Sequence, residues 1–331
     1  MKREFVESMR CPFCRNRLGL TVGEEDAREV REGRLDCSCG RSFPVHKGIP
    51  DFIDPTDETL AREVAGWIQL AGNLDEGLVP VMTALPQYPH PPWPHVAPDF
   101  FQIFEHLSFA GQNVVDIGAG RTWSSRFLKK LGLAKEVVAV DVLTTRFLGL
   151  ETADIFFEAD GMQFERVRGD IHRLPLHDNW ADAVFSCAAI HHSGDLDSLF
   201  AEVFRVLGPG GAFVFISEPV KMESIPGNRP NNIETELGIN EHFYSYREYK
   251  EALERAGFVF HRMVPRSLGY RMLYADPELV HDAPGPIQRF SMTPRGRKGL
   301  DLLLRNRFAG PWLYRKWSLP LSGIAQKPRP A

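Results

Sequence analysis

The chain has 331 residues, which corresponds to one large domain or two smaller ones. It has 43% hydrophobic and 25% charged residues and a net charge of −4, so it has the composition of a globular protein, without the strong positive charge that would draw its whole surface to nucleic acid. The first residues contain no apolar signal core and no apolar run reaches the length of a membrane span, so we expect a cytoplasmic protein without transmembrane segments.

Four of the five cysteines, Cys11, Cys14, Cys37 and Cys39, lie in the first 39 residues. Without an export signal, such clustering favours a metal over disulfides, and four thiolates suit a structural zinc ion. The C-S-C pair is one residue shorter than the common zinc knuckle. Three explanations stay open: the loop adapts, Asp36 contributes, or the module binds metal weakly or not at all and is held by its hydrophobic residues. We favour zinc.

Residues 55–98 predict a linker or lid. A helix is expected over 58–70, and the proline-rich run PQYPHPPWPHVAP that follows predicts neither regular helix nor central strand. A second helix is expected over 99–107.

The middle of the chain alternates strand and helix patterns. Strands are predicted at 113–118, 136–142, 164–170, 181–192 and 212–219, and helices at 123–132, 196–207 and 245–258, the last with a capping box at its start. GPGG at 208–211 is expected to end a helix and lead into a strand. This alternation predicts a mainly parallel sheet with helices on both faces.

A glycine turn follows the first of these strands. Gly118 and Gly120 match the first two glycines of the dinucleotide fingerprint, but Trp123 occupies the third position, where an indole obstructs close helix–strand packing. The chain also lacks the glycine-rich phosphate loop of nucleoside triphosphate enzymes. The sequence therefore favours a cofactor without phosphate.

Three carboxylates are placed at strand ends near this turn. Asp141 can accept hydrogen bonds from both ribose hydroxyls, and Asp170 from an adenine amino group, with Ile171 beside the ring. Asp116 lies under the turn, where it bonds backbone N–H groups or reaches the amino group of an amino-acid moiety; on its own it is also typical of a helix-capping acid. Together these groups describe S-adenosylmethionine.

The stretches VVDIGAG, VVAVDV, GDIHRLPLHDNWADAVFS, AAIHH and RVLGPGGAFVFISEP, in this order, resemble class I S-adenosylmethionine-dependent methyltransferases of the type 11-like group. The resemblance covers residues 99–262. It implies a Rossmann-like, seven-stranded, mostly parallel sheet, with VFHRMVP as its last strand. It adds Ala119, Val142 and Cys187 to the cofactor-binding residues, although Cys187 also suits a small core position. Arg121 departs from the small residue common there.

His191 and His192, just past the fourth strand, are the candidates for a general base. A structural role for both, bonding backbone or orienting a loop, is the alternative. His192 fits the family pattern better, and Glu218 at the end of the next strand is expected to anchor a loop.

The first module, with its PV-x-x-GIP-x-F-I ending, resembles the zinc ribbons related to the Trm112 family. We therefore expect four regions: a β-rich zinc ribbon over 1–54, a helix and proline-rich lid over 55–98, a catalytic domain over 99–265, and a basic extension over 266–331. Residues 289–317 contain eight Lys or Arg and one acid, which suits an anionic partner such as a lipid headgroup, but we favour a solvated helix face whose Leu and Trp pack on the catalytic domain.

The favoured function is methyl transfer to a small-molecule acceptor, such as a sugar, a lipid-linked compound or a secondary metabolite. The alternatives are an RNA base methyltransferase and a non-catalytic scaffold. The negative charge argues against RNA, and the retained acids argue against the scaffold. The sequence leaves the acceptor, the methylated atom and the oligomeric state open.

Overall fold

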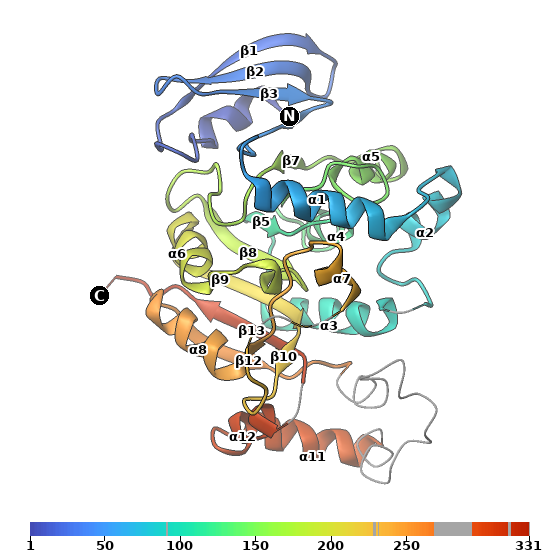
Figure 1. Cartoon of the computed structure of the whole chain (residues 1–331), viewed down its shortest axis with the longest axis vertical. Helices are drawn as coiled ribbons and strands as arrows, with labels where there is room; N and C mark the ends of the chain where they lie inside the picture. Colours follow the sequence, from blue (N-terminus) through green and yellow to red (C-terminus); the bar gives the residue numbers. More distant parts are fainter. Residues whose placement is uncertain (91, 228–229, 231, 268–292, 317–318, 331) are drawn as a thin grey trace.

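The computed structural model describes residues 1–90, 92–227, 230, 232–267, 293–316 and 319–330. The N-terminal module is a small antiparallel sheet, as predicted, and it lies at one end of the molecule (Figure 1). Its strands pair in chain order after a short 3-10 helix: η1 (Arg3–Ser8), β1 (Leu18–Glu25), β2 (Val30–Cys37), β3 (Ser42–His46) and β4 (Ile49–Pro50).

The linker that follows is more helical than the sequence indicates. It forms α1 (Glu58–Ala71), η2 (Glu76–Leu78), α2 (Val79–Ala84) and α3 (Trp93–His106). The prediction of no helix in the proline-rich run is wrong for its second half. Pro94 lies in the first turn of α3. Backbone N–H groups in that turn have no hydrogen-bond acceptor within the helix, so the missing N–H of proline breaks no helical hydrogen bond. The break that Pro98 would cause is offset because Val96, Phe100 and Ile103 bury one face of the helix.

The larger domain contains a seven-stranded sheet in the order β12-β13-β9-β8-β5-β6-β7. Its elements in chain order are β5 (Asn113–Ile117), α4 (Trp123–Lys130), β6 (Glu136–Asp141), η3 (Leu150–Thr152), α5 (Ala153–Asp160), β7 (Glu165–Arg168), β8 (Ala181–Cys187), η4 (Ile190–His192), α6 (Leu196–Val206), β9 (Leu207–Glu218), β10 (Val220–Lys221), α7 (Ile233–Glu236), β11 (Tyr244–Ser245), α8 (Tyr246–Arg255), β12 (Val259–Met263), α11 (Pro294–Arg305), α12 (Ala309–Lys316) and β13 (Leu321–Gln326). The β9-β8-β5-β6-β7 part is parallel, and β13 is antiparallel to both of its neighbours.

Helices cover both faces of this sheet, which confirms the Rossmann-like prediction. Residues of α3, α4 and α5 form one buried cluster with alternate sheet positions such as Val114 and Phe185. Residues of α6 and α8 form the other, with the intervening positions such as Val115 and Val184. Buried apolar side chains on both faces explain why the strands read as continuous hydrophobic runs.

Two details of the sheet differ from the predictions. β9 begins at Leu207 and continues through GPGG, which was expected to precede the strand. VFHRMVP supplies β12 at the sheet edge, but the last strand in the chain is β13, which lies between β12 and β9. The sheet therefore extends beyond the predicted boundary at residue 265. Of the expected basic extension, residues 268–292, 317–318 and 331 lie outside the described residues.

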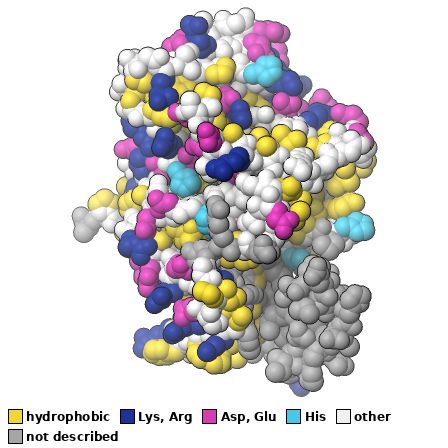
Figure 2. Space-filling model, viewed as in Figure 1, with side chains coloured by type: hydrophobic (Ala, Val, Ile, Leu, Met, Phe, Trp, Pro, Cys, Tyr) yellow, Lys and Arg dark blue, Asp and Glu magenta, His cyan; other side chains and the backbone are white. Residues whose placement is uncertain are grey.

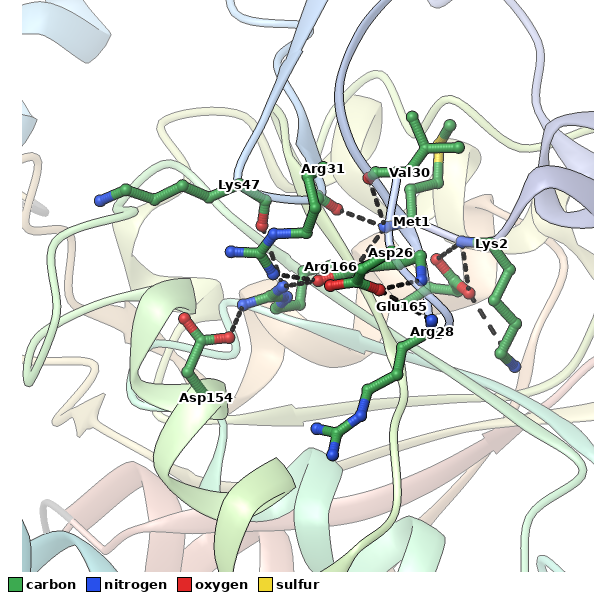
Figure 3. Close-up of polar contacts among 12 residues, drawn as sticks. Met1, Lys2, Asp26, Arg28, Val30, Arg31, Lys47, Asp154, Glu165 and Arg166 are labelled. Atoms are coloured by element: carbon green, nitrogen blue, oxygen red, sulfur yellow. Dashed lines mark hydrogen bonds and ion pairs between the residues drawn. The ribbon is translucent and has the colours of Figure 1, made fainter. Parts of the chain in front are cut away.

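Buried ion pairs join the N-terminal module to the catalytic domain. Arg166 of β7, whose side chain is fully buried, donates to Glu29 (3.0 Å), to Asp154 (2.7 Å) and to the carbonyl of Lys47 (3.1 Å) (Figure 3). The carbonyl of Arg168, at the end of β7, accepts from the N–H of Phe52 (2.9 Å). The small sheet is therefore fixed to the edge strand of the large one.

No helix in the described part of the chain has the length and apolar character that crossing a bilayer requires.

Candidate cofactor and acceptor site

The glycine turn between β5 and α4 has the conformation that its glycines allow. Gly118 has φ +64° and Gly120 has φ +46°. A Cβ atom on Gly118 would lie 2.2 Å from the Cβ of Ala189, so a larger residue does not fit there. Trp123, at the position of the missing third glycine, is buried and its ring centre lies 4.8 Å from that of Phe100 of α3. The indole thus anchors α3 where a dinucleotide fold needs close backbone packing.

Asp141, at the end of β6, holds this turn in place. Its Oδ2 accepts from the N–H of Gly120 (2.7 Å) and its Oδ1 from the N–H of Leu143 (2.8 Å). Burial raises the pKa of its carboxyl above the ordinary value. The backbone N–H of Val142 also acts on this carboxylate. A carboxylate has about four lone-pair sites, so acceptor capacity remains for a ligand hydroxyl.

Asp170, after β7, keeps one oxygen for a ligand. Its Oδ1 accepts from the backbone N–H of His172 (2.8 Å) and lies 2.8 Å from Nδ1 of that side chain. Among the described residues, none donates to Oδ2. Burial alone raises the pKa of Asp170, but the bonds and charge of His172 outweigh it and the pKa lies below its ordinary value. The Nε2 of His172 in turn lies 2.8 Å from the hydroxyl of Ser193.

These groups meet at a cavity of about 440 Å³, within the range of roughly 300–1,000 Å³ typical of small-molecule sites. The sheet side contributes eight of the nine residues predicted to bind a cofactor, and one predicted histidine: Gly118, Ala119, Gly120, Asp141, Val142, Asp170, Ile171, Cys187 and His192. The other side is formed by Trp93 of α3 and by α1 with its N-cap: Asp57, Thr59, Leu60, Glu63 and Trp67.

Asp116 is the predicted cofactor residue that does not line this cavity. It is 1% exposed, and its Oδ2 accepts from the hydroxyls of Ser124 and Ser125, both at 2.6 Å, in the first turn of α4. Burial raises its pKa to about 7. The contacts place Asp116 beneath the turn, where it orients the start of α4; a direct contact with a cofactor stays a prediction.

His191 lies behind the cavity wall, between two carboxylates. Its Nδ1 is 2.9 Å from Glu218 and its Nε2 is 3.5 Å from Glu241. Burial alone would lower its pKa, but these two partners outweigh burial and raise it to about 10. The imidazole is therefore protonated at neutral pH. Glu218 also accepts from the N–H groups of Ala189 and Ile190, which agrees with its predicted loop-anchoring role.

His192 lines the cavity and lies close to Glu63, a residue that the sequence analysis did not identify. Its buried Nδ1 lies 3.5 Å from Glu63 of α1 and 3.7 Å from Glu241, and it has no hydrogen bond within the described residues. Burial, reinforced by the charge of His191, lowers the pKa of His192 to about 3. Burial likewise raises the pKa of Glu63 to about 8. Both groups are therefore mainly uncharged at neutral pH.

The helix α1, which carries Glu63, packs closely against the segment that follows α7. A Cβ atom on Gly66 would lie 2.6 Å from the carbonyl oxygen of Leu237 and 2.9 Å from Ile239. The next residue, Asn240, lines the cavity and donates to the carbonyl of His192 (2.6 Å). No sequence signal distinguishes Glu63 from the other polar residues of α1, because its role depends on this tertiary contact.

The four N-terminal cysteines converge, although their spacing is unusual. All four sulfurs lie within 4.8 Å of one another, with Cys14 and Cys37 at 3.3 Å and Cys11 and Cys39 at 3.9 Å. Tetrahedral zinc with Zn–S bonds of about 2.3 Å needs sulfurs roughly 3.8 Å apart. Asp36 is bound instead to Arg34 and Ser42. The four thiols therefore converge near the spacing that zinc needs, although the Cys14–Cys37 distance is shorter, and Asp36 is not among the donors. Zinc binding by the short C-S-C pair stays a prediction.

Comparisons with known proteins agree with this geometry. Residues 115–215 match the family model described as "Methyltransferase domain". The sterol 24-C-methyltransferase erg6 of Aspergillus fumigatus is 30% identical over 131 residues, which cover 39% of this chain and 33% of that protein. The cycloartenol-C-24-methyltransferase 1 of Oryza sativa subsp. japonica is 24% identical over 53% of this chain and 48% of that protein. The chain thus spans a third to a half of the length of these relatives.

Among solved structures, the phosphoethanolamine N-methyltransferase 2 of Haemonchus contortus in complex with S-adenosyl-L-methionine has a TM-score of 0.44 and 18% identity, and the match covers 88% of this chain and 62% of that one. The YcgJ protein of Bacillus subtilis has a TM-score of 0.45 and 18% identity, with 70% and 99% covered. Residues 115–215 of this chain are thus similar to the family described as "Methyltransferase domain".

Proposed function

We propose that the protein is an S-adenosylmethionine-dependent methyltransferase that acts on a small-molecule acceptor. The observation that carries this proposal is the single cavity in which Asp141 and Asp170 keep free acceptor sites next to the glycine turn. Asp141 would bind the ribose hydroxyls and Asp170 the adenine amino group, as predicted. The cofactor, when bound, supplies an activated methyl group.

The protein's own contribution is to position the acceptor and exclude water. The helix α1 covers the cavity from the side opposite the sheet, and its Trp67 packs edge-on against His192 with 5.5 Å between ring centres. Holding two reactants in line is worth roughly 7–11 kcal/mol of the barrier. A cavity of about 440 Å³ suits a small acceptor and not a folded RNA.

When the methylated group of the acceptor molecule must lose a proton, Glu63 and His192 are the residues that take it up. A general base works best when its pKa lies near the working pH, and the pKa of Glu63, about 8, meets this condition. The neutral His192 next to it accepts or relays a hydrogen bond. His191, held protonated by Glu218 and Glu241, is a positioning residue.

We also propose that Cys11, Cys14, Cys37 and Cys39 bind one structural zinc ion. The support is the convergence of their sulfurs. The metal would add stability to a module that is too small for a large core of its own.

The test is a transfer assay with the full chain, methyl-labelled cofactor and two separate acceptor pools, a small-molecule extract and total RNA. We expect label in a small molecule, with little transfer by Asp141→Ala. Label in RNA would support the RNA alternative, and stable cofactor binding without transfer to either pool would support the scaffold.

A further inference from the structure

The helices α11 and α12 are anchored to the catalytic domain by one face only. Leu304, Leu313 and Tyr314 are buried, and the ring of Tyr314 stacks on that of Tyr246 with 5.1 Å between centres. These contacts agree with the expectation that this segment packs on the catalytic domain. They leave the opposite face without a partner among the described residues.

That opposite face carries four large apolar side chains in water. Leu302 is 72% exposed, Leu303 50%, Phe308 70% and Trp312 55%. The expectation that the Leu and Trp of this segment pack on the catalytic domain is therefore wrong for Leu302, Leu303 and Trp312. Together with the exposed Arg295, Lys298, Arg307 and Lys316, the four apolar residues are called the α11–α12 patch. In Figure 2 hydrophobic and basic side chains lie side by side at the lower end, where Figure 1 places these helices.

The basic residues of the patch lie beside its apolar residues, and the guanidinium of Arg307 lies 4.5 Å from the ring centre of Phe308. Arg295, Lys298 and Leu302 follow the three-and-four spacing that brings side chains to one stripe of a helix. Arg305 continues this stripe but pairs with Asp301 (2.7 Å), and Arg315 pairs with Glu223 (2.6 Å). The four basic residues of the patch form no ion pair with any residue that the structure describes. The patch is thus positive on a chain whose net charge is −4.

We propose that the α11–α12 patch docks on an anionic phospholipid surface. Leu302 and Leu303 on α11 and Trp312 on α12 are exposed, as is Phe308 in the turn between these helices. Exposed apolar side chains with flanking Lys and Arg are the pattern of a segment that lies in the membrane interface. The apolar side chains enter the acyl boundary while the cations remain with the phosphates. A second copy of the chain fits less well, because it would place like charges against each other. The proposal does not depend on the proposed activity.

The test is co-sedimentation of the full chain with vesicles of phosphatidylcholine alone and of equimolar phosphatidylcholine and phosphatidylglycerol. We expect at least roughly tenfold stronger binding to the anionic vesicles, and weaker binding as salt screens the charges. Two variants separate the contributions: Leu302→Ser with Phe308→Ser, and Lys298→Glu with Arg307→Glu. Each should lose most of the binding.

Two control variants carry the same number of changes at exposed positions elsewhere, at Leu131 and Leu133 and at Arg17 and Arg28. Leu131→Ser with Leu133→Ser, and Arg17→Glu with Arg28→Glu, should bind like the wild type. Equal sedimentation of the wild type with both vesicle types, or unchanged binding of both patch variants, would overturn the proposal. So would a dimer or an RNA complex that the patch variants abolish in the absence of vesicle binding.

Discussion

Glu63 offers a quantitative test of the acceptor side of the cavity. Burial raises its pKa from 4.5 to about 8, and repulsion from Asp141 and Glu241 adds to this effect, while Trp67 and His191 oppose it. At 1.36 kcal/mol per pKa unit, ionising Glu63 in the folded chain costs about 5 kcal/mol more than in the unfolded chain. This value is an upper figure, since the structure can relax around the charge.

The sign of the pH dependence follows from this difference. The unfolded chain loses the proton first, so the contribution of Glu63 to stability falls as pH rises from about 4.5 to about 8. Glu63→Gln does not ionise. The wild type should therefore lose stability relative to Glu63→Gln as pH rises over this range. The difference between their free energies of unfolding should change by up to about 5 kcal/mol in favour of Glu63→Gln.

The assay is urea unfolding of the ligand-free chain at several pH values, with Glu58→Gln at the exposed start of the same helix as the control. The control should follow the wild type throughout. A constant difference between Glu63→Gln and wild type at every pH would refute the buried, protonated Glu63. If Glu63 is also the base, Glu63→Gln should lose about 10²–10⁴-fold in turnover together with the rise in rate toward pH 8.

Three further changes test other parts of the structure. Gly118→Ala should cost about 2–5 kcal/mol from strain and overlap, whereas Gly161→Ala, with similar φ and nothing within 4 Å, should cost about 1–3 kcal/mol; thermal unfolding compares them. Cys14→Ser should abolish the bound zinc detected by native mass spectrometry, and Cys187→Ser should retain it. Arg166→Leu should lose roughly 1.5–3 kcal/mol, because it removes the buried cation that Glu29 and Asp154 share while Glu29 keeps Met1 and Arg31; an unchanged melting temperature would contradict the role of this interface.

The parallel part of the sheet was predictable because its signals are local. Apolar runs ending in acids predicted the strands and placed Asp141 and Asp170 at one edge of the sheet. The strand β13 was missed because it is an antiparallel insertion from a distant, basic part of the chain, and only long-range pairing with Phe215 and its neighbours defines it. The helix that begins at Trp93 was missed because its prolines fall where tertiary burial offsets them.

The residues of the site likewise fall into those that local sequence predicts and those that only tertiary contacts define. The spacing of the glycine turn and of the acids at the strand ends predicted one group of these residues, and the family resemblance added Ala119, Val142 and Cys187; all of these line the cavity except Asp116. Glu63 and Asn240 were not predicted, because each enters the cavity through contacts between α1 and the segment after α7. The different environments of His191 and His192 also depend on tertiary contacts. Glu218 and Glu241 lie on both sides of the His191 imidazole, whereas His192 lines the cavity.

The central claim is that one cavity binds a phosphate-free adenosine cofactor through Asp141 and Asp170. Calorimetric titration of the full chain with S-adenosylmethionine, with NAD as the phosphate-containing comparison, tests it most directly. We predict saturable binding of S-adenosylmethionine only, weakened at least roughly tenfold by Asp141→Ala, which removes hydrogen bonds worth about 1.5–3 kcal/mol each. Absence of binding, or equal affinity in wild type and Asp141→Ala, would contradict the account.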